Sequence, residues 1–141
     1  MRPIAARTLS LIQLDDLSAS QLDRARAFSF LVLETSPENF QAWVAVTDAS
    51  PETVRRVKKA AGADLNASGA TRLAGSYNFK SKYAPKYPRV RLHSIAPLHA
   101  VTVGELDRAG LTAPEDRTPR APRHAPTHHL ACVAQLRALS G

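Results

Sequence analysis

The sequence has a single cysteine, Cys132, and no apolar stretch near the roughly 20 residues that a membrane-spanning helix requires. One cysteine excludes an intrachain disulfide and fits a reduced compartment. Residues 1–7 lack the long apolar core of a secretory signal peptide. We therefore expect a cytoplasmic protein that has no membrane partner.

Acidic residues are scarce relative to basic ones: 12 Asp and Glu stand against 19 Lys and Arg, which gives a net charge of +7. An excess of positive charge favours polyanionic partners, nucleic acid first among them. The length of 141 residues allows one domain with a modest core. Because a basic surface alone is also common without such a partner, the function has to come from particular residues.

Local signals predict where helices and turns begin and end. Ser18 and Gln21 have the spacing of a helix capping box, and residues 36–39 form a turn cluster between two apolar runs. Residues 50–52, Ser-Pro-Glu, are typical of a helix start, and Gly62 of a helix end. The predicted strands cover residues 9–16, 28–35, 40–46 and 89–96, and the predicted helices cover residues 19–27, 51–61 and 102–109.

This order of elements is strand, helix, strand, strand, helix, loop and strand. It predicts an α+β fold, an RNA-recognition-motif-like (ferredoxin-like) antiparallel sheet with two helices on one face. We expect residues 5–100 to form the folded core. Residues 101–141 are expected to form a short helix and a Pro-, Arg- and His-rich tail with little order. Because this fold hosts many activities, it names none by itself.

Two adjacent carboxylates, Asp15 and Asp16, end the first predicted strand. Such a pair is unfavourable unless a cation lies between the two, and Mg²⁺ prefers oxygen ligands. Neighbours in a regular strand point to opposite faces, so both reach one ion only where the strand ends or twists. Asp64, from a distant segment, is a candidate third ligand. The alternative is that Asp15 and Asp16 only cap the strand and favour the N-terminus of the next helix, and that Asp64 is a solvated loop acid.

The segment of residues 67–80 shows neither helical nor strand periodicity, yet it holds Arg72, Asn78 and Lys80 among glycines. Glycine lets a backbone approach a ligand closely, and Arg grips phosphate through two parallel hydrogen bonds. We expect Arg72 and Lys80 to bind a triphosphate and Asn78 to bind a sugar hydroxyl or a phosphate. The alternative is a basic surface loop.

Aromatic and basic residues alternate in the next segment, where Lys82, Tyr83 and Lys86 follow the loop. Stacking planes among cations suit single-stranded nucleic acid. Arg55 and Lys59, on the second predicted helix, are further candidates for contacts with a phosphate backbone. A charged helix face is, alternatively, simply solvated.

Three longer strings carry a resemblance to a known family. They are residues 14–17 (LDDL), residues 34–43 (ETSPENFQAW) and residues 68–80 (SGATRLAGSYNFK). Together they resemble the RepB-like DNA primase domain of the archaeo-eukaryotic primase superfamily, which is found on plasmids and mobile elements. The resemblance extends from about Leu9 to Val90.

The resemblance implies template-directed primer synthesis for plasmid or mobile-element replication, with residues 5–100 as the catalytic palm. It implies catalytic, metal-binding aspartates, and Mg²⁺ or Mn²⁺ as the cofactor. The implied partners are a single-stranded DNA template, nucleoside triphosphates and a helicase or other replication proteins. The implied metal ligands are Asp15, Asp16 and Asp64, and the implied nucleotide-binding residues are Arg72, Asn78 and Lys80, with Gln41 as a weaker contact.

The chain departs from the family pattern in three places. Family members carry a longer segment before the acidic pair, whereas 14 residues precede Asp15 here. They often carry a C-terminal helical module where this chain has its proline-rich tail, and related primases often place a histidine in the second motif. Two alternatives therefore stay open: a non-catalytic single-stranded nucleic-acid-binding module, and an inactive primase fragment.

Overall fold

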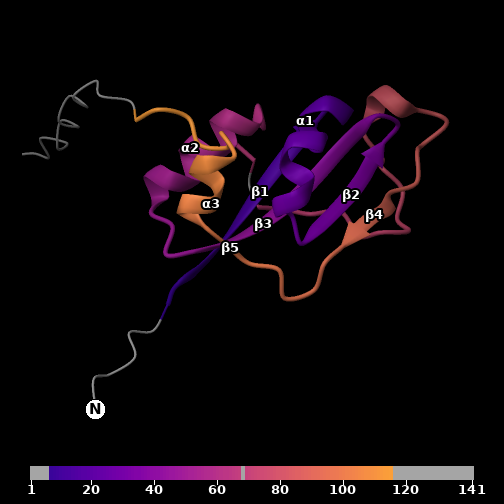
Figure 1. Ribbon diagram of the computed structural model, residues 1–141. Coiled ribbons are helices and arrows are strands. Elements are labelled where there is room, and N and C mark those ends of the chain that lie inside the picture. The colour runs from indigo at the N-terminus through magenta and orange to yellow at the C-terminus, as the bar shows by residue number, and fades with distance from the viewer. Residues whose placement is uncertain (1–6, 68, 116–141) are drawn as a thin grey trace, which may run out of the picture.

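The computed structural model describes residues 7–67 and 69–115, which form an α+β fold with an open antiparallel sheet and helices (Figure 1). The strands are β1 (Leu9–Leu17), β2 (Leu31–Ser36), β3 (Asn39–Thr47), β4 (Arg91–Ile95) and β5 (Val101–Thr102). The helices are α1 (Ala19–Ala25), α2 (Pro51–Ala61) and α3 (Val103–Arg108), with short 3₁₀ turns η1 (Arg26–Phe28) and η2 (Ser81–Tyr83). The predicted fold class is confirmed.

The strands lie in the order β1-β3-β2-β4, and neighbours along this path are antiparallel. The short strand β5 pairs in parallel with the last residues of β3. β4 therefore lies beside β2 at one edge, and β1 forms the other edge. The predicted hairpin is the pair β2–β3.

The helix starts follow from local capping, as expected. Ser18 forms a full capping box with Gln21 at the start of α1. The Ser50 side chain accepts a hydrogen bond from the backbone of Thr53 at the start of α2, next to a proline in the first turn. Gly62 ends α2 in the left-handed conformation, with φ of 70°.

One face of the sheet packs against the helices. Ile12 and Leu14 of β1 alternate with residues that point to the other face, and both are buried. The core is a single cluster to which all three helices contribute. Its helical members are Leu22 and Ala25 of α1, Val57 and Ala61 of α2, and Leu106 of α3.

The segment after residue 100 belongs to the same core as the residues before it. Val101, Leu106 and Leu111 are all buried in the central cluster. A hydrophobic face on a short helix has to be covered, and the sheet covers it here. The proline-rich tail that was predicted after this segment lies outside the described residues.

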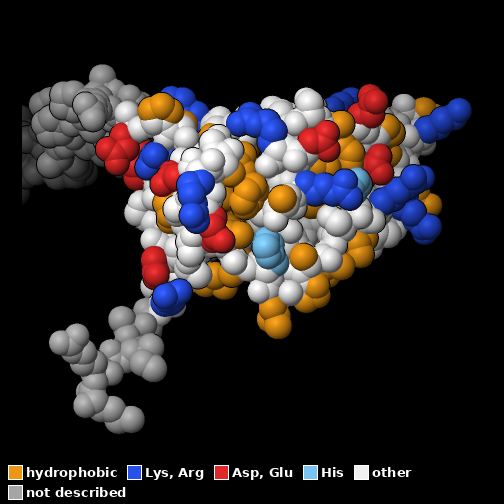
Figure 2. All heavy atoms as spheres, viewed as in Figure 1, with side chains coloured by type: hydrophobic (Ala, Val, Ile, Leu, Met, Phe, Trp, Pro, Cys, Tyr) orange, Lys and Arg blue, Asp and Glu red, His pale blue; other side chains and the backbone are white. Residues whose placement is uncertain are grey.

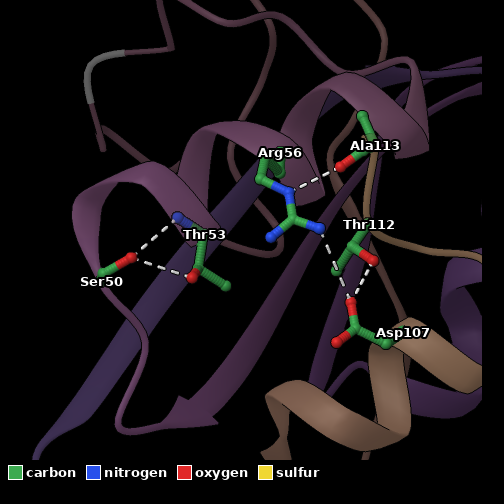
Figure 3. Close-up of polar contacts among 6 residues, drawn as sticks. All are labelled: Ser50, Thr53, Arg56, Asp107, Thr112 and Ala113. Carbon is green, nitrogen blue, oxygen red and sulfur yellow. Dashed lines mark hydrogen bonds and ion pairs between the residues drawn. The ribbon is translucent and has the colours of Figure 1, made fainter. Parts of the chain in front are cut away.

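Polar contacts also attach α3 to α2, as Figure 3 shows. Arg56 Nε donates to the backbone oxygen of Ala113 over 2.6 Å, and its guanidinium lies 3.9 Å from Asp107 Oδ1. Thr112 donates to the same carboxylate. These contacts and the buried Leu106 place residues 101–113 firmly in the fold.

The other face of the sheet carries no described helix. Leu9 and Leu11 of β1 and Leu92 and Ile95 of β4 are exposed there. A register shift near His93 interrupts the alternation of a regular strand and places Leu92 and Ile95 on the same face. We call this face the open face. None of the described helices is long and apolar enough to cross a membrane.

Candidate active site

A polar cavity of about 310 Å³ opens on the open face, where β1, β2 and β3 meet the segment of residues 69–80. It brings Asp15 together with Arg72 and Lys80, which lie far from it in the sequence. Its lining residues are Asp15, Thr35, Asn39, Gln41, Ala70, Thr71, Arg72 and Lys80. The cavity therefore has a carboxylate and amides on the strands and two cations on the loop.

A β-bulge at Asp15 and Asp16 explains how two neighbouring carboxylates face the same side. Leu14 pairs with Ala42 and Leu17 pairs with Phe40, so both acids lie opposite a single residue of β3. Asp16 takes the left-handed conformation, with φ of 61°, which aspartate tolerates better than most residues. Both acids lie between residues of the helix-covered face, so both belong to the open face.

The two carboxylates are held by neutral amides. Gln41 Nε2 donates to Asp15 Oδ1 over 3.2 Å, and Asn39 Nδ2 donates to Asp16 Oδ1 over 2.6 Å. Asn39 is fixed in turn because its Oδ1 accepts from the Thr35 hydroxyl over 2.9 Å. Within the described part of the chain, neither carboxylate has a Lys or Arg nitrogen within 4.0 Å. Their negative charges therefore remain available to a cation.

Gln41 connects the carboxylate to the loop and is almost fully buried. Its amide nitrogen reaches Asp15 and the backbone oxygen of Ala70, and its oxygen accepts from the Thr71 hydroxyl over 2.6 Å. Gln13 Nε2 donates to the same Ala70 oxygen over 2.6 Å. In the structure Gln41 positions the Asp15 carboxylate and the loop backbone. The sequence had suggested only a weak contact with a nucleotide.

Asn78 is not among the residues that line the cavity, although it was predicted to bind the nucleotide. Its side chain is only 2% exposed. Its Nδ2 donates to the backbone oxygen of Thr35 over 2.8 Å, and its Oδ1 accepts from the backbone of Lys80 over 3.4 Å. Both ends of its amide form hydrogen bonds inside the fold. Asn78 therefore connects the loop to β2 and contacts the backbone of the neighbouring Lys80.

Asp64 approaches the site through its backbone. Its N–H donates to the backbone oxygen of Asp15 over 3.1 Å, whereas its carboxylate accepts from the backbone of Asn66 over 2.9 Å. Across residues 7–67 and 69–115, no group of three or more His, Cys, Asp or Glu side chains is placed to hold a metal ion. The predicted cluster of three carboxylates is thus not assembled in this structure.

Tyr83, predicted to contact nucleic acid, is half-buried at η2 and attached to the sheet. Its hydroxyl donates to Ser36 Oγ over 2.7 Å, and Lys82 Nζ lies 4.9 Å from its ring centre. The Ser36 hydroxyl donates in turn to the phenolate once Tyr83 is ionised. This hydrogen bond, followed by the charges of Lys82 and Lys80, lowers the pKa of Tyr83. Lys82 and Lys86 are exposed on the same segment.

Basic side chains gather at the end of the molecule that carries β4, with acidic side chains between them (Figures 1 and 2). Arg55 and Lys59 do not belong to the cavity. They line a shallow hollow with Glu52, on α2, and this helix packs on the opposite face of the sheet. Arg55 and Lys59 therefore do not form a continuous surface with Lys82 and Lys86 beside the cavity.

The fold and the site define an α+β domain with two aspartates on a strand bulge, of which Asp15 shares a polar cavity with two cations of a glycine-containing loop. Residues 2–100 match the family described as the RepB DNA-primase N-terminal domain. The match covers well over half of the sequence, so the chain belongs to this family.

Similar proteins agree with this assignment. Mobilization protein A of Escherichia coli is 35% identical over 97 residues, which cover 61% of this chain and 14% of that protein. The crystal structure of primase RepB′ has a TM-score of 0.54 and 34% identity, covering 77% of this chain and 42% of that chain. The catalytic domain of primase RepB′, in complex with initiator DNA, has a TM-score of 0.52 and 35% identity, covering 77% and 62%. The chain thus spans only part of each relative.

Proposed function

We propose that this chain carries the catalytic site of a metal-dependent DNA primase, which makes primers on single-stranded DNA for plasmid or mobile-element replication. One observation carries the proposal: a single polar cavity joins Asp15 to Arg72 and Lys80. A nucleoside triphosphate needs both a divalent cation and positively charged donors, and this cavity offers partners for each. The primase RepB′ domain complexed with initiator DNA supports DNA as the template.

The donors present fit Mg²⁺ or Mn²⁺. Asp15 and Asp16 supply hard carboxylate oxygens, and among the described residues the side chains that donate to them are neutral amides. The chemistry supplied by such an ion is activation of a primer 3′-hydroxyl and neutralisation of the pyrophosphate that leaves. With two carboxylates in the described site, phosphate oxygens and water would complete the coordination.

The chain's own residues perform the remaining tasks. Arg72 and Lys80 bind the triphosphate and stabilise the charge that develops on it, as fixed donors do in other phosphoryl transfers. Gln41 holds the Asp15 carboxylate and the loop backbone in one geometry. Because these donors are set before a substrate arrives, little reorganisation is needed at the moment of reaction.

Primer synthesis on single-stranded DNA with Mg²⁺ or Mn²⁺ tests the proposal, and Mn²⁺ and nucleotide binding are measured alongside by calorimetry. We expect Asp15→Asn and Asp16→Asn each to lower synthesis at least about 100-fold and to weaken Mn²⁺ binding. Arg72→Gln should weaken nucleotide binding. Asp23→Asn, a carboxylate on α1 away from the cavity, is the matched control. Undiminished synthesis by the Asp15→Asn, Asp16→Asn double variant would remove both acids from the mechanism.

A second candidate function is a non-catalytic single-stranded DNA-binding module. The observation in its favour is that the described residues assemble no group of three metal ligands. It predicts salt-sensitive DNA binding that is independent of divalent metal and of both aspartates. Nucleotide titrations with and without Mn²⁺ separate the two functions, since only the enzyme needs metal for tight nucleotide binding.

A further inference from the structure

A short two-stranded ribbon borders the cavity and has no role in the chemistry proposed above. Val90 N–H donates to the Ser76 oxygen and Asn78 N–H donates to the Pro88 oxygen, both over 2.8 Å. Between these bonds Tyr77 pairs with Arg89 as an antiparallel bridge. The next facing pair in this register is Phe79 with Tyr87.

The two sides of the ribbon differ sharply. Asn78 and Val90 point inward and are 2% and 1% exposed. The outward side carries aromatic residues, of which Tyr77 is 48% and Phe79 is 68% exposed. We call the outward residues Tyr77, Phe79, Tyr87 and Arg89 the aromatic ribbon.

The aromatic ribbon is an ordered surface. The Phe79 and Tyr87 ring centres are 5.0 Å apart with an interplanar angle of 60°, and the Tyr77 and Phe79 centres are 6.1 Å apart. The Arg89 guanidinium carbon lies 5.6 Å from the Tyr77 ring centre. Adjacent aromatic contacts hold each ring in place, so the exposed faces are presented in a fixed arrangement.

Such a surface is unusual on a folded chain, because exposed aromatic rings keep apolar area in water. Its neighbours indicate the kind of partner. Lys82 and Lys86 are exposed on the segment that connects the two strands of the ribbon, and Arg89 belongs to the ribbon itself. Flat rings among cations match a ligand with flat bases and a phosphate backbone, whereas an apolar protein segment would need no such charge.

We propose that the aromatic ribbon binds single-stranded DNA by stacking bases on Phe79 and Tyr87. It places the strand next to Lys80, which follows Phe79 directly and lines the cavity. Asn78 couples the two sites, since its side chain fixes the ribbon to β2 and accepts from the Lys80 backbone. The choice of DNA as the ligand rests on the proposed function.

The test is binding of a fluorescein-labelled, mixed-sequence single-stranded oligonucleotide to the full chain, followed by fluorescence anisotropy without nucleotide. We expect Phe79→Ala and Tyr87→Ala each to weaken binding about tenfold. Phe79→Trp should keep the affinity, because any large ring offers a stacking plane. Arg89→Gln should lower the slope of log K against log salt by about 0.7. Leu98→Ala, at a fully exposed aliphatic residue outside the ribbon, is the control and should bind normally.

Thermal unfolding of each variant shows whether it is folded, and the anisotropy data then decide. Wild-type affinity in a folded Phe79→Ala, Tyr87→Ala double variant would overturn the proposal, as would a failure of the wild-type chain to bind DNA. Nucleotide binding and primer synthesis report separately on the cavity. If both are absent while DNA binding still depends on Phe79 and Tyr87, the ribbon proposal stands and the primase proposal fails.

Discussion

The two faces of the sheet are held by different physics. On the helix-covered face, aliphatic side chains from β1 and β3 meet all three helices through contacts that have no direction. On the open face, amides, hydroxyls and carboxylates are joined by directional hydrogen bonds between segments as distant as Gln13 and Ala70. The first arrangement provides stability, and the second fixes the positions of chemical groups.

This difference predicts different consequences of mutation. A truncation on the helix-covered face should lower the free energy of unfolding and leave ligand affinity unchanged below the unfolding transition. A substitution in the polar network should change ligand binding, and it should change stability only where a buried partner is left unsatisfied. Variants on each face therefore test whether the division holds.

The largest effect is expected for Leu106→Ala on the helix-covered face. Leu106 is fully buried in the core cluster, so its truncation should lower the free energy of unfolding by about 2–5 kcal/mol. Urea denaturation measures this change, and nucleotide affinity measured well below the transition should not move. Leu98→Ala, at a fully exposed leucine, serves as the control. An unchanged stability would mean that the helix after residue 100 contributes little to the core.

Much of the helix-covered face could be predicted because its signals are local. Ser18, Ser50 and Gly62 act on residues within a few positions of themselves, and each has its expected capping role. The burial of residues 101–113 escaped prediction because a six-residue helix has too short a pattern to reveal what it covers.

The open face could be predicted in its composition but less well in its geometry. Arg72 and Lys80 line one cavity together with Asp15. The bulge that brings Asp16 to the same face as Asp15 depends on how β1 pairs with β3. No pattern in the neighbouring residues predicts this pairing. Asn78 looked like a ligand contact because its type suits one, yet its burial against β2 arises only from tertiary structure.

Asn78→Ala gives an intermediate effect that sharpens the comparison. The change removes the donor to the buried Thr35 oxygen and should cost about 1–3 kcal/mol of stability. It should also weaken nucleotide binding, because Lys80 loses a support of its backbone. Leu106→Ala, in contrast, should affect stability alone. The exposed Asn66→Ala is the matched control. Normal stability combined with lost nucleotide binding would instead make Asn78 a direct ligand contact.

The smallest effect concerns Tyr83, which joins the basic segment to the end of β2. Its hydrogen bond with Ser36, with the nearby charges of Lys82 and Lys80, lowers its pKa in the folded protein, so folding favours the phenolate. The resulting contribution to stability is complete above the unfolded pKa of tyrosine. It is lost as the pH falls through the folded pKa.

An ultraviolet absorbance titration should show one tyrosine that ionises below the ordinary range, and Tyr83→Phe should remove that transition. Ser36→Ala deletes the largest cause of the shift and should move the transition upward. If Ser36→Ala leaves the transition unchanged, the lowered pKa of Tyr83 comes from the lysines alone. The hydrogen bond that ties η2 to the sheet would then contribute nothing measurable, and the open face would lose one of the directional contacts that distinguish it.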